Sequence, residues 1–472
     1  MRRFLSHTIV RVILAAILLV VVAWGLVFRR MYYKPAEHER SGVGEAWLTN
    51  GFAVAVVWPP HTDLSLVEGV KLAVEEINAN PTTTTVGETS AGSLTIAVAS
   101  TKDFVIPGGL LVDGARVSCQ SVTASGFAGC VGTPAMPAGR TVRASTSELA
   151  GKIRMRYFVE PPGDTGRGIR AFDVVKNTDV VAVIGHEGQG SAIPASITYE
   201  NHGLLFLSPK ATDMRLTSHG FNYVFRLTPG DSVITAALAD FAKERGWNRI
   251  GILYGRNDHG ESASGLFLEK AKGDGLTIPF FKSYLEEPDW MSQDFRPVVA
   301  DIGKKSFDAI MIADQLPWAA KVLVDMGRMG LTQPILATDK LDSEQIWQVA
   351  QAASNNVYVA SAVDPTSTVP AYAAFRERFR RRYKDANGNP VNPGYGASQG
   401  YETMMTFVNA VLLSRSADPI VVATTLRTVK WSGLFGDFTF EPNGDIDGRT
   451  ISIKRMQNGT FRTVGAMKET RQ

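Results

Sequence analysis

The stretch Val180–Thr212, VVAVIGHEGQGSAIPASITYENHGLLFLSPKAT, decides the fold of this 472-residue chain. It contains two short apolar runs, Val180–Ile184 and Leu204–Leu207, with a glycine-rich segment between them. Short apolar runs of this kind are typical of strands that are covered on both faces in a parallel sheet. The stretch therefore predicts two neighbouring strands of an α/β domain.

A glycine-rich turn and a helix connect these two predicted strands. Gly188, Gly190 and Ser191 bring the chain into the helix, Pro194 is expected in its first turn, and Gly203 is expected to end it. In such a unit the free N–H groups of the helix start face the carboxyl end of a strand, where open α/β sheets bind their ligands. We therefore expect this turn to bind a small anionic group.

Length and composition fit a protein with more than one core. A chain of this length with 44% hydrophobic residues can build two lobes. The 49 basic and 46 acidic side chains leave a net charge of +3, which favours no polyanionic partner. We therefore expect no binding to nucleic acid.

The rest of the chain alternates between strand and helix patterns. A first strand is expected at Phe52–Val57, and Asp231 or Ser232 is expected to cap a helix after Gly230. Regular alternation predicts a parallel, doubly wound sheet. Further strands are expected at Ile153–Val159, Ile250–Tyr254, Ile278–Phe281, Ala309–Ala313, Ile335–Ala337 and Val357–Val363.

The N-terminal segment contains an apolar run between basic residues. Val12–Phe28 carries no charge, and as a helix it would be roughly 25 Å long. It is either a retained membrane anchor or a cleavable signal peptide. Val21-Val22-Ala23 is a passable cleavage site, but the apolar run continues past it, which favours the anchor.

An ordered set of short motifs carries a resemblance to a known family. The chain closely resembles the solute-binding proteins of type I periplasmic-binding fold, in particular those that serve branched-chain amino-acid ABC transporters. The resemblance covers about Gly51–Gly465 apart from an insertion. The motifs are Val183-Ile184-Gly185-His186, Pro194-Ala195-Ser196 and Ser208-Pro209-Lys210-Ala211-Thr212, followed by Leu216 and Phe225-Arg226.

The resemblance implies two doubly wound α/β lobes joined by three hinge crossings, preceded here by one N-terminal hydrophobic helix. The crossings are expected at Thr228–Asp231, Asp364-Pro365 and Gly433–Gly436. The expected segments are an anchor and tether at 1–50, a first lobe at 51–228 with an insertion at 81–150, a second lobe at 229–362, a return to the first lobe at 363–432 and a return to the second lobe at 433–472.

The insertion is expected to consist of β-ribbons and loops. It is rich in threonine, glycine, serine and proline, and it contains the two cysteines of the chain, Cys119 and Cys130. Because the resemblance implies export from the cytoplasm, a disulfide is favoured over two free thiols. Two cysteines without neighbouring histidines give no case for a zinc site.

The resemblance assigns ligand contacts in the first lobe to two turns. Gln189 and Ser191 lie at the turn whose hydroxyl and N–H groups hold a ligand carboxylate. Lys210, Ala211 and Thr212 form the second turn, which receives an α-ammonium group on a carbonyl and a hydroxyl. Lys210 introduces a cation where a small residue is common, so a second ligand carboxylate is a plausible partner for it.

Three further contacts are expected from other loops. Trp58 either contacts the ligand or packs the lobe. His259 stands in place of a usual aromatic residue, and Asp339 stands in place of an acid that pairs with the ligand ammonium. Each of these residues could also serve only to shape a turn, although a binding role is favoured for Asp339.

No sequence motif supports catalysis. Gly188-Gln189-Gly190 lacks the third glycine of a dinucleotide fingerprint, and no GK[ST] loop or H-E-x-x-H motif occurs. We therefore expect no enzyme activity and no cofactor. The expected function is capture of an amino-acid-like or carboxylate solute for the permease of an ABC importer, on the periplasmic side of the inner membrane. The alternatives are a soluble periplasmic form after signal cleavage, and a sensory or structural partner that has lost solute binding.

Overall fold

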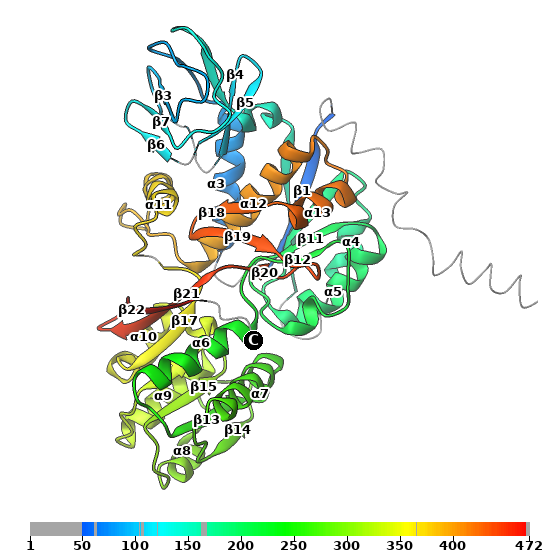
Figure 1. Ribbon diagram of the computed structural model, residues 1–472. Helices are drawn as coiled ribbons and strands as arrows, with labels where there is room; N and C mark the ends of the chain where they lie inside the picture. Colours follow the sequence, from blue (N-terminus) through cyan, green and yellow to red (C-terminus); the bar gives the residue numbers. More distant parts are fainter. Residues whose placement is uncertain are drawn as a thin grey trace, which may run out of the picture.

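The computed structural model describes residues 50–60, 64–102, 104, 108–119, 121–161, 168–364 and 366–468. The expected N-terminal helix, Val12–Phe28, and the tether after it lie outside these ranges. Within them the chain forms two α/β bodies and one smaller β insertion (Figure 1). We call the body around the five-stranded sheet the first lobe and the body around the seven-stranded sheet the second lobe.

The sheet of the first lobe is parallel throughout. Its order is β12-β11-β10-β1-β9, so the first strand of the chain lies beside the strand that opens the glycine-rich stretch. Every residue of β1 and β10 is buried, which confirms the prediction of strands covered on both faces. The strands are β1 Phe52–Trp58, β9 Ile153–Val159, β10 Val180–Gly185, β11 Leu205–Ser208 and β12 Val224–Arg226.

Helices cover both faces of this sheet. Ala53 and Ala55 pack with α4 and α5 on one face, whereas Val54 and Val56 pack with α3 and α12 on the other. This alternation follows from the two-residue period of a strand. The helices of the first lobe are α3 Ser65–Ala79, α4 Arg170–Val175, α5 Gln189–Asn201, α11 Pro370–Arg382, α12 Tyr395–Ser414 and α13 Pro419–Thr428.

Helix α5 begins directly after Gly188 and ends before Gly203, whose φ is +59°. Pro194 lies inside the helix, in its second turn, so the expectation of a first-turn proline was wrong. The helix starts at Gln189, so Pro194 is its sixth residue. Gly203 has the left-handed backbone conformation that commonly follows the end of a helix.

The sheet of the second lobe has the order β14-β13-β15-β16-β17-β21-β22. The first five strands are parallel, and β21 and β22 run antiparallel at one edge. The strands are β13 Ile250–Gly255, β14 Phe281–Tyr284, β15 Ala309–Ala313, β16 Ile335–Ala337, β17 Val357–Ser361, β21 Thr450–Gln457 and β22 Thr460–Lys468. The helices are α6 Asp231–Glu244, α7 Asp258–Gly273, α8 Arg296–Ile302, α9 Trp318–Arg328 and α10 Gln345–Ala350.

The start of α6 differs from the expectation. Gly230 is the N-cap residue, and no side chain caps the helix. Asp231 is instead the first helical residue, and its side chain is fully buried. The groups that contact its carboxylate therefore lie inside the molecule.

The insertion is a β structure with its own core, as expected. Ile96, Phe104 and Phe127 are buried in it, and two small sheets surround them. It lies at the end of the first lobe away from the second lobe, at the top of Figure 1. Its strands are β2 Thr82–Thr84, β3 Thr95–Ala97, β4 Gly108–Val112, β5 Ala115–Cys119, β6 Ser121–Thr123, β7 Gly126–Ala128 and β8 Thr141–Ala144.

In the described part of the chain, three connections run between the lobes. They follow β12, β17 and β20 (Ile446–Asp447). The expected crossing at Gly433–Gly436 was wrong, because these residues join β18 (Trp431–Gly433) to β19 (Gly436–Phe440) in an antiparallel pair. Leu434, Phe438 and Phe440 pack in the core of the first lobe. The chain returns to the second lobe only after β20, before Thr450 opens β21.

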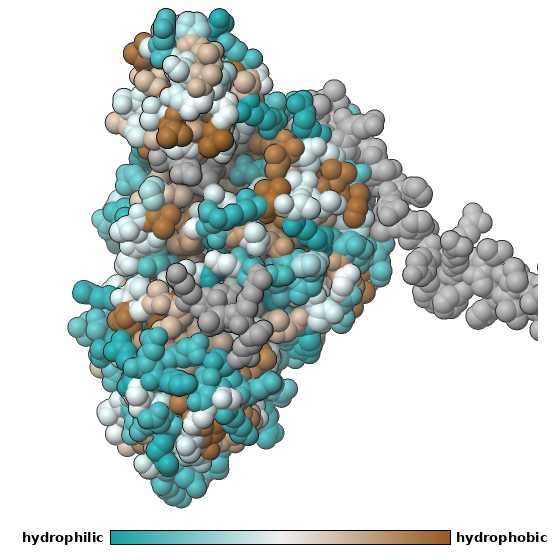
Figure 2. Space-filling model, viewed as in Figure 1, coloured by the Kyte–Doolittle hydropathy of each residue, from teal (hydrophilic) through white to brown (hydrophobic). Residues whose placement is uncertain are grey.

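Over the ranges that the structure describes, no single helix is long and apolar enough to cross a membrane. The bent pair α12 and α13 meets the length and composition requirement only when both helices are taken together. Apolar side chains lie scattered over the face in Figure 2, and the second lobe is mostly hydrophilic there. Scattered apolar residues are normal on a folded surface.

Cys119 and Cys130 are joined in a disulfide, which confirms the expected bridge. Alkylation of the exported protein under denaturing, non-reducing conditions should therefore label neither cysteine. Because the bridge closes a short loop, its reduction should lower the free energy of unfolding of the insertion by about 2–3 kcal/mol. Labelling of both thiols before reduction would contradict this expectation.

Candidate functional site

The glycine-rich turn before α5 brings a polar side chain into a buried position. Gln189 is 5% exposed, and its Nε2 has no hydrogen-bond partner. Ser191 Oγ donates to Gly188 O at 3.4 Å. The helix start also points its free N–H groups and the positive end of its dipole at this place. The turn is therefore suited to a ligand oxygen that accepts hydrogen bonds.

A buried chain of polar side chains supports this turn from behind. His186 Nδ1 contacts Glu160 Oε1, and His186 Nε2 lies 3.0 Å from Tyr199 Oη. The other oxygen of Glu160 accepts from the N–H of Glu187 at 3.2 Å. Burial alone would raise the pKa of Glu160, but the hydrogen bond and charge of His186 lower it overall. An ionised Glu160 thus holds the backbone of the turn in place.

The second turn of the first lobe is fixed by Arg226. Its Nη1 donates to the carbonyls of Thr212 at 2.7 Å and Asp213 at 2.9 Å, and its Nη2 lies 2.6 Å from Asp445 Oδ1. The guanidinium is fully buried. Thr212 is also fully buried, and its hydroxyl makes no hydrogen bond of ordinary geometry, although it lies near enough to Asp231 to help lower the pKa of that carboxyl.

Lys210 and Trp58 contact each other beside these turns. Lys210 Nζ lies 5.5 Å from the centroid of the Trp58 ring and 3.7 Å from Glu187 Oε1. Trp58 is 1% exposed and belongs to the core of the lobe. Ala211 is buried in the other core of the lobe. Lys210 thus has two partners of its own, with which a ligand carboxylate would have to compete.

The second lobe contributes a carboxylate and an imidazole. His259 Nε2 lies 2.8 Å from Thr338 Oγ1, and its Nδ1 lies 3.6 Å from Asp231 Oδ1, too far for a hydrogen bond. Ser262 Oγ donates to the other oxygen of Asp231 at 3.2 Å. Burial would raise the pKa of Asp231, but His259 and the ammonium of Lys340 bring it down to about 2. Asp231 is therefore ionised although it is fully buried.

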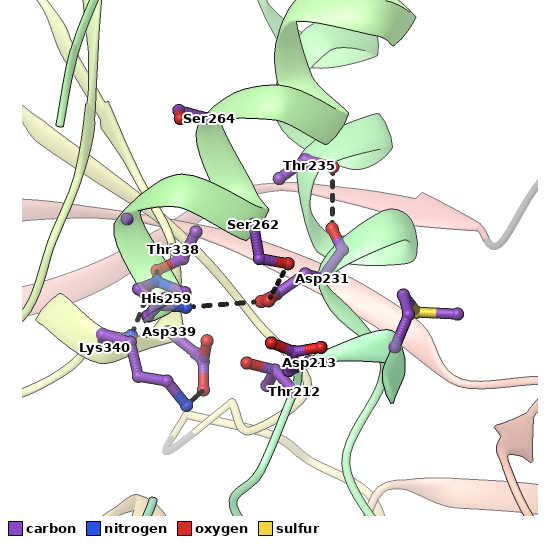
Figure 3. Close-up of polar contacts among 12 residues, drawn as sticks. Thr212, Asp213, Asp231, Thr235, His259, Ser262, Ser264, Thr338, Asp339 and Lys340 are labelled. Carbon is purple, nitrogen blue, oxygen red and sulfur yellow. Dashed lines mark hydrogen bonds and ion pairs between the residues drawn. The ribbon is translucent and has the colours of Figure 1, made fainter. Parts of the chain in front are cut away.

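Asp339 and Lys340 complete the site from the second lobe. Asp339 Oδ2 lies 3.5 Å from Lys340 Nζ, and its Oδ1 has no partner. Lys340 Nζ also donates to the carbonyl of Lys210 at 2.9 Å. This hydrogen bond joins the two lobes. Figure 3 shows Asp231, Asp339 and Thr212 pointing toward the same space between the segments that carry them.

Unpartnered polar atoms concentrate at this junction. Burying such an atom costs about 1–3 kcal/mol unless it finds a hydrogen-bond partner, so the arrangement fits a solute that supplies the missing partners. Among the described residues, those at the junction are Gln189 Nε2, Ser208 Oγ, Thr212 Oγ1, Asp231 Oδ1, His259 Nδ1 and Asp339 Oδ1.

The sequence named four of these six residues: Gln189, Thr212, His259 and Asp339. It missed Asp231, because an acid after a glycine at a helix start has the pattern of a cap. It also missed Lys340, which stands next to Asp339 without any signal of its own. Ser208 was noticed only as part of a motif.

Two α/β lobes that meet over shared polar groups define a protein of the periplasmic-binding type. Residues 164–457 match the family described as periplasmic binding protein, which is more than half of the chain. The chain therefore belongs to this family.

Relatives of this chain are named for the amino acids that they bind. The Leu/Ile/Val/Thr-binding protein of Salmonella typhimurium is 24% identical over 291 residues, 61% of this chain and 76% of the relative. The leucine-, isoleucine-, valine-, threonine-, and alanine-binding protein of Pseudomonas aeruginosa is 23% identical over 301 residues, 64% and 78% of the two chains.

Solved structures share the fold. A substrate-binding protein of an ABC transporter from Desulfitobacterium hafniense in complex with Leu has a TM-score of 0.64 and 24% identity, and covers 88% of this chain and 99% of its own. A solute-binding protein from R. palustris in complex with benzoate has a TM-score of 0.63 and 13% identity, and covers 88% and 96%.

Thr212→Val tests whether the unpartnered hydroxyl belongs to the binding site. The substitution keeps the shape and removes a buried group without a partner, so the thermal midpoint of the free protein should stay or rise. Solute affinity should fall about five- to tenfold, the worth of one hydrogen bond, as measured by calorimetric titration. Thr403→Val is the matched control, because Thr403 in α12 also carries a buried, unpartnered hydroxyl and lies two helical turns beyond the start of that helix. Equal affinities in the parent and the Thr212 variant would contradict the assignment.

Proposed function

We propose that this chain is an extracytoplasmic solute-binding protein that captures a small amino-acid-like or carboxylate ligand between its two lobes for an ABC importer. The observation that carries the proposal is the set of unpartnered buried polar atoms that both lobes bring to one junction. Family membership supports a binding role rather than catalysis.

The chemistry of the first-lobe turn supports a carboxylate on the ligand. Helix α5 has thirteen residues, and free N–H groups lie at its start. The buried side-chain amide of Gln189 lies there too, and its Nε2 is a hydrogen-bond donor without an acceptor. A carboxylate accepts several such hydrogen bonds at once. The names of relatives and neighbours, which include amino-acid binders and a benzoate complex, agree with this ligand class.

Closure of the lobes supports capture rather than surface adsorption. The contact between Lys340 Nζ and Lys210 O links the segment after β16 in one sheet to the turn after β11 in the other. We propose that the first lobe comprises residues 51–228 with the insertion at 81–150, together with 363–447, and that the second comprises 229–362 and 448–468. The crossings between them would act as the hinge.

The proposed location is the periplasmic side of the inner membrane. The apolar run Val12–Phe28 is proposed to remain as an anchor, with the soluble periplasmic form after cleavage as the alternative. The partner in transport would be the membrane permease of the importer. A sensory or structural role without solute binding is the second candidate, but the unpartnered polar atoms of the junction argue for a solute.

A thermal-shift screen of amino acids and small carboxylates tests the proposal. A ligand that binds only the folded protein stabilises it by RT ln(1 + [L]/Kd), which is about 2.7 kcal/mol at a hundredfold excess over Kd. At least one compound should raise the thermal midpoint in proportion to the logarithm of its concentration. A screen in which no amino acid and no carboxylate raises the midpoint would favour the sensory or structural role instead.

A further inference from the structure

The ammonium of Lys340 has an unusual position for a lysine. Its side chain is 9% exposed, and its Nζ lies 2.9 Å from Lys210 O and 3.5 Å from Asp339 Oδ2. Both neighbours are acceptors, one from each lobe. Burying an ammonium is costly unless acceptors surround it, and here they do.

The same acceptors are those on which a ligand ammonium would have to bind. The resemblance assigns a ligand ammonium to a carbonyl and a hydroxyl of the turn Lys210 to Thr212 and to the carboxylate of Asp339. Lys340 Nζ contacts the carbonyl of Lys210 in this turn and the carboxylate of Asp339. A second ammonium at this place would face a like charge in a site shielded from water.

Asp339 and Lys210 each have a partner of opposite charge within the chain. Asp339 has Lys340 beside it, and Lys210 has Glu187 beside it. Asp231 lies at the positive end of α6 and beside His259. The remaining oxygens of Asp231 and Asp339 need a hydrogen-bond donor, and a water molecule beside the ligand meets that need without a charge.

We infer that Lys340 supplies from within the chain the cation that an amino-acid ligand would otherwise bring, and that the site therefore selects carboxylates without an amino group over the matching amino acids. This inference rests on the proposed function, since it names the ligand class of the same site. A ligand carboxylate would bind at the Gln189 turn, and Lys340 would face the uncharged part of the ligand next to it.

Matched pairs of ligands test the inference on the full-length protein. Each pair consists of an amino acid and the 2-oxo acid of the same carbon skeleton, taken for alanine, leucine, phenylalanine and glutamate. Calorimetric titration should give at least tenfold tighter binding of the 2-oxo acid in every pair that binds. In Lys340→Met the ratio of the two affinities should shift at least tenfold toward the amino acid, because the ammonium position becomes free.

Lys321→Met is the matched control. Lys321 is also a partly buried lysine of the second lobe and pairs with a buried carboxylate, that of Asp325, at 3.0 Å. It lies on α9, outside the site, so its removal should leave the ratio of affinities unchanged. The control separates loss of a buried ion pair from loss of the cation in the site.

The remaining outcomes distinguish failure of the inference from failure of the proposed function. If the wild-type protein binds amino acids as tightly as their 2-oxo acids, Lys340 moves aside for the ligand and the inference is overturned, while the proposed function stands. An unchanged ratio in Lys340→Met overturns the inference in the same way, and the wild-type ratio decides alone if that variant does not fold. If neither member of any pair binds, the proposed ligand class fails and the inference fails with it.

Discussion

The buried guanidinium of Arg226 is the group on which the geometry of the site depends. Arg226 ends β12, directly before the first crossing between the lobes, and its partner Asp445 precedes β20, directly before the last crossing. A buried guanidinium is stable only when its N–H groups are paired. The carbonyls of Thr212 and Asp213 are two of its partners, so one side chain holds the second turn and the starts of two crossings in a single arrangement. Thr212 is thereby presented to the second lobe.

Binding and closure are linked through the polar groups of the junction. When the lobes meet without a solute, buried atoms such as Asp339 Oδ1 and Gln189 Nε2 lose water without gaining a hydrogen bond. A solute that supplies their partners removes this cost, so it favours the closed arrangement over the open one. The hydrogen bond from Lys340 to Lys210 O contributes to closure with or without the solute. It offsets part of this cost.

The sequence predicted the strands of the fold better than the site. Ala309–Ala313 and Ile335–Ala337 were found with their observed bounds, because buried parallel strands leave continuous apolar runs. Ile153–Val159 was also found with its observed bounds, although it is a partly exposed edge strand that contains two arginines. The strand expected at Ile278–Phe281 lies at Phe281–Tyr284 instead, after Pro279, which has no N–H to donate to a neighbouring strand. In the site, Asp339 and Thr212 followed from the resemblance, whereas Asp231 and Lys340 act through contacts between distant segments. Local patterns carry no signal of such contacts.

The distance between the lobes is the most direct test of capture by closure. Both native cysteines are joined in the disulfide, so cysteines introduced at the exposed positions Lys176 in the first lobe and Lys272 in the second would be the sites that react with a spin label. Double electron–electron resonance should give a broad distribution of distances without solute and a narrow, shorter one with a saturating solute from the thermal-shift screen. The same distribution with and without that solute would contradict the account.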